Sequence, residues 1–580
     1  MIKENIIDSL KTCLIIKNVN EIKYKKFRKR YYNVCFECEL VVSENITVEI
    51  VLCIPHRWDQ ELIDIYLKNY TGKFIPHIES DGKICLFETE GILIDIDLIG
   101  IITQSLYRAR NIILDGNSGR NKKDFIDEFE LYWLQLPYVK SAKLVVPTDN
   151  CSILLKCYRE HVPQKRKEKQ VAYLQRKNNA ILYVAEEADS LKSWNLNRAS
   201  VVNAAFFVIN PTKYIFPPDI REPVSIGYFK ELLRYVFYQD IKKIWNKLGK
   251  EKIIFFRINQ PDNSQNYLGF YLLNGFLQSC DESIEINGIN QIKPISVRRE
   301  DKEYLLMRTV DQSFSQYSTK ILIIGCGSIG GHVINELSKA GFEDLTIVDD
   351  DILTEENIFR HVLGMEYILQ YKSVAMENYI KKNIPRMLIK SLAEKIEDVV
   401  EDGSIALDEY DIVIAATGNH NVNRWLNRFV YKNEIDTPII YAWNEVYGIG
   451  NHVAFFKRGN VGCFECLFGR DIDKNEIYDK SSYCAKGQKI VKSVGCGKSF
   501  VPYGNLISQK TTMIVLDMIK RIVDGEIENN YLVSVKGDDT YFKQMNLTTS
   551  TRYQKQKNIL NELTGDLFAN MKCGVCNDSM

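Results

Sequence analysis

Residues 320–372 hold the densest set of groups that could bind a nucleotide. The apolar run 321–324 enters a glycine turn, Gly325-x-Gly327-x-x-Gly330, and an amphipathic stretch follows to about Lys339. A glycine turn between a buried strand and a helix places phosphate at the helix N-terminus, where N–H groups and the helix dipole favour negative charge. Dinucleotide dehydrogenases share such glycines, so the turn alone is a weak signal. The prediction of a nucleotide site depends more on the polar residues that follow, namely Asp349, Asp351, Asn357, Arg360 and Lys372.

Two C-x-x-C pairs form a second set of residues with recognisable chemistry. Cys463 and Cys466 make one pair, and Cys573 and Cys576 make the other, about 110 residues further on. Each pair can chelate a metal through a tight turn, and four thiolates form a closed tetrahedral Zn²⁺ site of the structural kind. A disulfide is the weaker alternative, because a reducing compartment disfavours it.

The composition narrows the class of protein. With 580 residues the chain is too long for one core, and about three domains are expected. Lys+Arg equals Asp+Glu at 75 each, so bulk charge predicts neither nucleic-acid nor membrane binding. The first residues lead into an amphipathic helix rather than a signal peptide, and no run approaches the ~20 apolar residues that span a bilayer. We therefore expect a cytoplasmic protein with mostly reduced cysteines.

The first two of three regions differ in pattern. Residues 1–150 open with a helix and continue with alternating strands at 35–42 and 46–54 and a helix at about 98–113, an α+β order. A C-x-x-C in the first of these strands has no second pair, and we interpret it as packing. Residues 151–300 contain strand-like runs but no residues to which chemistry can be assigned, and we treat them as a middle or linker domain.

The third region, 301–580, contains the nucleotide unit. Its strands at 321–324, 345–348 and 411–414 alternate with helical stretches, which is typical of an α/β fold with a parallel sheet. A long cysteine-bearing loop and a helix at 506–523 follow. The chain as a whole is therefore expected to be a multidomain protein of α/β and α+β classes.

The order G-x-G-x-x-G, D-x-D, N-x-x-R and then a lysine resembles the adenylating domain of ubiquitin-activating enzymes and their bacterial ThiF/MoeB-type relatives. The resemblance implies a Rossmann-like fold that binds ATP and Mg²⁺. It assigns Asp349 to the ribose hydroxyls, and Arg360 and Lys372 to the polyphosphate charge. The full set of expected nucleotide ligands is Gly325, Gly327, Gly330, Asp349, Asp351, Asn357, Arg360 and Lys372.

This sequence departs from the family at one magnesium ligand. The family usually has an aspartate just after the fourth strand, where this chain has Gly418. Either Asp351 or Asp350 replaces it at the metal, or the domain adenylates poorly; we favour the replacement. The family also works as homodimers in bacteria, so Arg308, just ahead of the first strand, is expected to be the arginine that a partner subunit lends to ATP.

The same resemblance predicts a catalytic thiol. In the family a cysteine lies on a loop before a glycine-containing stretch and a long helix, and Cys496 occupies that place ahead of the 506–523 helix. Lys498 or a helix N-terminus nearby would raise its thiolate fraction. Cys484 is the alternative nucleophile.

Residues 74–86 resemble the active-site stretch of ubiquitin-conjugating enzymes, H-P-N-φ-x-x-x-G-x-φ-C-φ, where φ is apolar. Pro76, Gly82 and Cys85 keep their spacing, whereas Ile75 stands at the histidine and His77 at the asparagine. The resemblance implies an α+β fold in which Cys85 carries a thioester and His77 donates a hydrogen bond to the oxyanion. The tryptophan commonly found beyond the cysteine is missing, so we expect a trimmed version of the fold.

Together, the two domains resemble the fused ubiquitin-transfer-like enzyme of bacterial anti-phage CBASS operons, for which the run from Asn357 to Gly364 is typical. The resemblance implies that ATP activates the C-terminal carboxylate of a partner protein, which in this group is the operon's nucleotide cyclase. The acyl group would pass from Cys496 to Cys85 and then to a target lysine. A sulfur-carrier activator and a catalytically degenerate binding scaffold are the alternatives.

Overall fold

The computed structural model divides into two compact units, Met1–Asp301 and Lys302–Met580. It describes residues 2–577 except 23–25, 29, 70, 88–93, 95, 148–150, 161, 167, 187–198, 281–282, 308–318, 385–386, 472–475, 489 and 494–498. Among the described residues, no helix is long and apolar enough to span a membrane.

The first unit begins with a four-stranded antiparallel sheet in the order β1-β4-β5-β6. Its elements are α1 (Ile2–Thr12), β1 (Ile16–Glu21), β2 (Lys26–Phe27), β3 (Arg30–Tyr31), β4 (Val34–Ser43), β5 (Ile46–Ile54), β6 (Asp64–Leu67) and α2 (Leu98–Ser118). The inward side chains of β4 alternate with outward ones and pack on the apolar face of α2, which produces a one-sided core. The sequence-predicted strands and both helices are confirmed.

Helix α2 runs five residues past its expected end at 113. It contains Gly116, whose bare Cα lies close to Ile75: a Cβ there would come within 2.6 Å of that side chain. The helix ends at Gly119, which adopts a left-handed φ of +79° and closes the last turn. The glycine in the helix therefore reflects close packing on the segment that leads to Cys85, and not a chain break.

The rest of the first unit is a closed barrel in the order β10-β11-β12-β13-β7-β9-β8. Its strands are β7 (Lys140–Leu144), β8 (Ile153–Glu160), β9 (Leu182–Ala185), β10 (Ala199–Ile209), β11 (Glu251–Asn259), β12 (Gln265–Cys280) and β13 (Ser283–Arg299). Its helices are α3 (Asp124–Asp127), α4 (Phe129–Gln135), α5 (Gln170–Asn178), α6 (Ile226–Leu233) and α7 (Tyr238–Trp245). One apolar cluster fills the barrel, and a second, rich in aromatic residues, joins its outer face to α4, α6 and α7.

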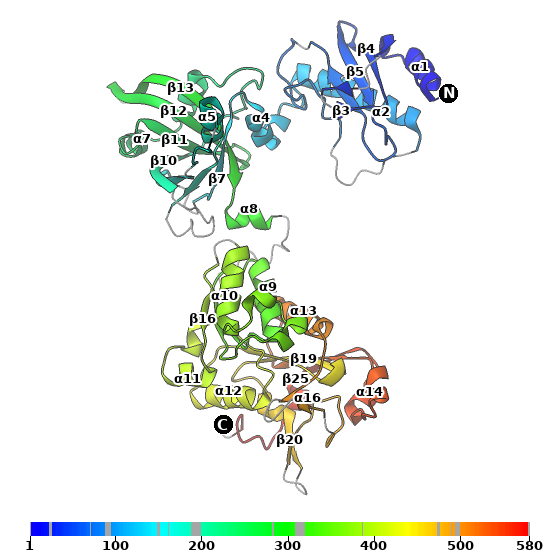
Figure 1. The fold of residues 1–580 in the computed structure, drawn as a ribbon, viewed down its shortest axis with the longest axis vertical. Coiled ribbons are helices and arrows are strands. Elements are labelled where there is room, and N and C mark those ends of the chain that lie inside the picture. The colour runs from blue at the N-terminus through cyan, green and yellow to red at the C-terminus, as the bar shows by residue number, and fades with distance from the viewer. Residues whose placement is uncertain are drawn as a thin grey trace. The chain divides into compact units, whose positions relative to one another are not determined.

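The second unit is built on an eight-stranded sheet in the order β16-β15-β14-β17-β18-β19-β24-β25. The strands from β16 to β18 are parallel, and the remaining pairings are antiparallel. In Figure 1, α9, α10 and α13 lie above this region and α11 and α12 below it, each group with its own apolar cluster. Because helices cover both faces, strands such as β14 are apolar at every position.

The bounds of the second unit's elements are as follows. The strands are β14 (Ile321–Ile324), β15 (Leu345–Val348), β16 (Lys390–Leu392), β17 (Ile412–Ala415), β18 (Ile439–Asn444), β19 (Gly450–Phe456), β20 (Phe468–Asp471), β21 (Glu476–Asp479), β22 (Lys492–Ser493), β23 (Ser499–Phe500), β24 (Tyr531–Lys536) and β25 (Leu560–Thr564). The α-helices are α8 (Lys302–Leu306), α9 (Ser328–Lys339), α10 (Lys372–Asn383), α11 (Ile396–Glu401), α12 (His420–Lys432), α13 (Asn505–Val523), α14 (Thr540–Gln544), α15 (Thr551–Lys555) and α16 (Gly565–Phe568). The 3₁₀ turns are η3 (Glu355–Arg360), η4 (Met365–Tyr367), η5 (Leu407–Glu409), η6 (Val446–Gly448) and η7 (Phe464–Leu467). The predicted strands at 321–324 and 345–348 are confirmed, and the one expected at 411–414 lies one residue later.

Candidate active sites

The glycine turn joins β14 to α9, and its three glycines have different reasons to be glycine. Gly325 has a φ of +91°, and a Cβ on it would lie 2.7 Å from the carbonyl oxygen of Ala416. A Cβ on Gly330 would lie 1.8 Å from the carbonyl oxygen of Gly325. A Cβ on Gly327, at the N-cap of α9, would meet nothing within 4 Å. The outer two glycines are therefore required by the fold, whereas Gly327 leaves room for a ligand at the helix N-terminus.

Asp349 and its neighbours lie at the carboxyl end of β15, beside that turn. The Asp349 carboxylate accepts hydrogen bonds from the backbone N–H of Cys326 (2.5 Å) and of Asp351 (2.9 Å), and burial raises the pKa of Asp349. Lys372, at the start of α10, is buried and extends its Nζ to 2.7 Å from the Asp351 carboxylate. The structure thus brings Asp349, Asp351 and Lys372 together at one edge of the sheet, beside the glycine turn.

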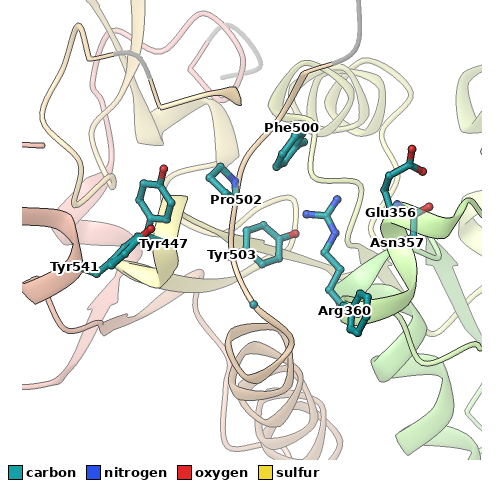
Figure 2. A pocket seen from close by; sticks show the side chains of 10 residues that line it. Glu356, Asn357, Arg360, Tyr447, Phe500, Pro502, Tyr503 and Tyr541 are labelled. Carbon is teal, nitrogen blue, oxygen red and sulfur yellow. The ribbon is translucent and has the colours of Figure 1, made fainter. Parts of the chain in front are cut away.

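Asn357 and Arg360 lie on η3, at the edge of a cavity of about 560 Å³. The Asn357 side-chain oxygen accepts a hydrogen bond from the N–H of Thr354 and caps its own turn. Arg360 donates to the carbonyl of Val501 (3.4 Å), and its guanidinium lies 5.4 Å from the ring centre of Tyr503. Figure 2 shows that guanidinium directed across the cavity toward the 500–504 segment. Arg360 therefore connects the nucleotide unit to the segment that leads into α13.

His361 is hydrogen-bonded to the backbone of the glycine turn. The sequence motif alone does not assign His361 any role at the nucleotide site. Its Nε2 donates to the carbonyl of Cys326 (2.6 Å), while Nδ1 accepts from the N–H of Leu363 (3.1 Å), so the ring is the neutral Nε2–H tautomer. Burial lowers the pKa of His361 to about 4, in agreement with that tautomer. The only indication of this role in the sequence was that His361 directly follows Arg360 in the motif.

Gly418 follows β17 with a left-handed φ of +66°, next to Asn419 at the N-cap of α12. A Cβ on Gly418 would meet nothing within 4 Å, so space is not what excludes a side chain there. Asp350 and Asp351, which follow β15, are exposed. The replacement of the family's usual magnesium ligand by one of them stays a prediction.

The four cysteines of the two C-x-x-C pairs converge. Their sulfur atoms all lie within 4.8 Å of one another, with Cys463 3.6 Å from Cys573 and Cys466 3.5 Å from Cys576. Asn427 on α12 orients the first pair, since its Nδ2 lies 3.6 Å from the Cys463 sulfur. Four converging thiols fit a closed Zn²⁺ site, and they would join η7 to the C-terminal residues.

Two expected catalytic residues, Arg308 and Cys496, lie outside the described residues, and so does Lys498, which was expected to raise the thiolate fraction of Cys496. The alternative nucleophile Cys484 is described and is only 7% exposed. Burial raises the pKa of Cys484 to about 11, with the Glu445 carboxylate as a second cause. Its backbone N–H donates to that carboxylate (3.0 Å). Cys484 is thus a buried, protonated thiol, poorly suited to nucleophilic attack.

Cys85 lies in the loop after β6 and is exposed at a cavity of about 420 Å³. Its N–H donates to the carbonyl of His77 (2.8 Å), which links the two predicted conjugating residues. His77 has a φ of +64°, a left-handed conformation that asparagine and histidine adopt more readily than most residues. The fold therefore accepts histidine at the family's asparagine position.

His77 is surrounded by acidic groups that the sequence did not reveal. Its Nε2 lies 2.9 Å from Asp124 and its Nδ1 lies 3.3 Å from Glu128. A hydrogen bond with Cys85, followed by those with Glu128 and Asp124, raises the pKa of His77 to about 10. These carboxylates lie 47 and 51 residues further along the chain, so no local motif could have indicated them.

Comparison with protein families shows which class of protein the chain belongs to. Residues 310–558 match the ThiF family, and residues 17–141 match the prokaryotic E2 family B. The chain therefore joins an activating domain of ThiF type to a conjugating domain of E2 type, which is the architecture of a fused, ATP-dependent enzyme of ubiquitin-activating and ubiquitin-conjugating type. The expected fold class, an E2-like α+β domain ahead of a Rossmann-like ThiF domain with converging cysteines, is confirmed.

Two curated relatives span most of the chain. It is 23% identical over 469 residues to the ATP-dependent ubiquitin transferase-like protein Cap2 of Pseudomonas aeruginosa, covering 78% of this chain and 80% of the relative. It is 22% identical over 515 residues to the protein of the same name from Escherichia coli, covering 80% and 83%. Among solved structures, Escherichia coli MccB with ATP is similar at 16% identity and a TM-score of 0.31, covering 46% of this chain and 68% of that one.

Proposed function

We propose that the protein activates the C-terminal carboxylate of a partner protein with ATP and transfers the acyl group through Cys496 and Cys85 to a target lysine. The carboxylate attacks the α-phosphorus of ATP and pyrophosphate leaves. The Cys496 thiolate then displaces AMP, the Cys85 thiolate displaces Cys496, and a lysine amine displaces Cys85 to form an amide. The observation that carries the proposal is an exposed thiol in an E2-type loop, Cys85, on the same chain as a ThiF-type nucleotide unit.

Residues of the second unit would perform the first step. The N-terminus of α9 would hold phosphate, Asp349 the ribose, and Arg360 and Lys372 the charge that develops on the α-phosphate. Asp350 or Asp351 would hold Mg²⁺, since hard carboxylate oxygens are its preferred protein ligands. Zn²⁺ at the four cysteines would be structural, because a closed tetrahedral site leaves no position for substrate.

The target amine would reach Cys85 through the adjoining cavity of about 420 Å³. Within it, the buried Asp64 is neutralised by Arg30 and Lys83, each at 2.9 Å. The Glu79 carboxylate also lines this cavity and favours an incoming ammonium group, whereas Glu61 pairs with Arg30.

The proposed partners rest on similarity to the Cap2 relatives. Since Cap2 proteins are ubiquitin transferase-like, we propose the CBASS nucleotide cyclase as acyl donor and anti-phage defence as the biological role. The use of ATP and of reduced thiols fits a cytoplasmic enzyme. We also propose a homodimer in which Arg308 of one subunit completes the ATP site of the other. Exposed apolar residues on the contacting elements η3 and α13, Phe359 and Leu506, offer a surface for it.

The test uses the full chain with ATP and a cyclase C-terminal tail. We expect pyrophosphate exchange and an adduct that a reducing agent removes. Cys496→Ala should abolish the adduct, and Cys85→Ala should abolish amide product. Cys151→Ala is the matched control, since Cys151 is also exposed but belongs to neither site. Full amide product from Cys85→Ala would refute the conjugating role, and no exchange with any tail would favour a binding scaffold.

A further inference from the structure

The segment formed by α3, Glu128 and α4 faces the loop that carries His77 and Cys85. Each ring nitrogen of His77 faces a carboxylate oxygen, Nε2 that of Asp124 and Nδ1 that of Glu128. A carboxylate can only accept hydrogen bonds, so both nitrogens must carry a proton to satisfy both contacts. His77 is thus held as an imidazolium, in contrast to the neutral asparagine of related enzymes.

Tyr132 extends the network from the ring to the backbone. Its hydroxyl accepts from the N–H of His77 (2.7 Å) and donates to Glu128 (2.7 Å). Burial alone would raise the pKa of Glu128, but its hydrogen bonds with His77 and Tyr132 hold that pKa below its ordinary value. One residue therefore fixes both the left-handed backbone of His77 and the carboxylate that keeps its ring charged.

The opposite side of this segment is anchored in the barrel. Trp133 is buried and donates its indole N–H to the carbonyl of Ile295 on β13 (2.8 Å). The side-chain amide of Asn266 on β12 donates to the carbonyl of Ile126 (3.0 Å). The N–H of Tyr267 donates to the Glu130 carboxylate (2.9 Å). The barrel thus holds the segment by hydrogen bonds at three successive turns.

We propose that residues 124–133 are the second half of the conjugating site: Asp124 and Glu128 are positioning residues that keep His77 charged beside Cys85, and the barrel holds them in place. The inference rests on the proposed acyl transfer to Cys85. When an amine attacks the thioester carbonyl, the C–S bond breaks, its electron pair leaves on the Cys85 sulfur, and the amine's proton goes to water. The imidazolium stabilises that departing thiolate, and also the thiolate that first accepts the acyl group.

Two measurements on the full chain test the inference. The first is the alkylation rate of Cys85 by iodoacetamide at pH 6–9, followed by peptide mass spectrometry, which needs no acyl donor. The second is single-turnover transfer from loaded Cys85 to lysine. In the double variant Asp124→Asn/Glu128→Gln we expect both rates at pH 8 to fall about ten- to a hundredfold, the range for a lost charged hydrogen bond. The rise of the alkylation rate with pH should move to higher pH in the variant, because the released histidine is neutral above about pH 7 and no longer stabilises the thiolate.

The controls separate charge from structure. Gln135→Ala removes a contact between the same two segments, from the N–H of Ser80 to Gln135 (2.9 Å), and should leave both pH profiles unchanged. Glu128→Asp keeps a carboxylate at this position, so its alkylation and transfer rates should lie between those of the wild type and those of the double variant. Trp133→Phe removes a barrel hydrogen bond but no charge, so it should slow alkylation without altering its pH dependence.

Two results would overturn the inference. One is a folded double variant with the wild-type alkylation profile, and the other is an equal loss in Gln135→Ala. An unchanged alkylation rate in Trp133→Phe would refute only the positioning role of the barrel, and not the role of Asp124 and Glu128. If the wild-type protein never loads Cys85 from ATP, the proposed function fails, while the alkylation profiles still decide whether the network acts on the thiol.

Discussion

The substitution Gly330→Ala tests whether the glycine turn requires a residue without a Cβ at position 330. The new Cβ would lie 1.8 Å from the carbonyl oxygen of Gly325, where real Cβ atoms stay beyond 3.0 Å. The obstacle is backbone, not the end of a flexible side chain, so either the turn or the start of α9 has to move by more than an ångström. Gly327→Ala, three residues earlier in the same turn, creates no contact within 4 Å.

The size of the effect follows from that overlap. Overpacking costs about 1–3 kcal/mol when side chains can adjust, so a backbone clash should cost about 3 kcal/mol or more. For a unit of this size, about 2–4 °C of melting temperature corresponds to 1 kcal/mol, which predicts a decrease of about 6–12 °C for Gly330→Ala. Gly327→Ala weakens only an N-cap and should cost about 1 kcal/mol at most. Its methyl group occupies the space left for phosphate, so nucleotide binding should still weaken.

The assay compares both variants by thermal unfolding, by hydrogen exchange of β14 and β15, and by ATP–pyrophosphate exchange. We expect Gly330→Ala to lose protection in these strands together with activity. Gly327→Ala should lose activity with near-normal protection. If Gly330→Ala melted within about 2 °C of wild type, the turn would be more plastic than its contacts indicate, and the reasoning from the close approach would be wrong.

Three further outcomes are expected. Cys463→Ser should lose stoichiometric Zn²⁺ in metal analysis, because one of four converging thiolates is removed. Cys484→Ser should keep the ATP-dependent, reducing-agent-sensitive adduct in gel assays, since its thiol is buried. Glu445→Gln should destabilise the second unit by about 3–5 kcal/mol in denaturant unfolding, because Glu445 pairs with the fully buried His452 at 2.8 Å. The pKa of Glu445 is held below its usual value, so the stabilisation that its carboxylate gives to the fold is present above about pH 4.5 and is lost on acidification. The Glu445→Gln variant should lack this pH-dependent part of the unfolding free energy.

The features that the sequence alone predicted are those encoded in short segments. The apolar runs at 321–324 and 345–348 and the glycine turn between them define a strand–turn–helix–strand unit without reference to the rest of the chain. The spacing of Pro76, Gly82 and Cys85 likewise predicted an E2-type domain, which the family match over residues 17–141 confirms. The two C-x-x-C pairs predicted one cluster across about 110 residues, because thiol pairs with metal-binding spacing have few other uses in a reducing compartment.

Tertiary structure decided what surrounds those groups. The sequence left Cys484 open as a nucleophile, and only its burial beside Glu445 argues against it. The sequence suggested a hydrogen-bond donor at His77, but only the fold places the Asp124 and Glu128 carboxylates beside that ring, where they raise its pKa. The closed barrel likewise depends on strand pairings between distant segments, such as β7 with β13. Local periodicity and ligand spacing are properties of short stretches of chain, but burial and electric field depend on residues that only folding brings together.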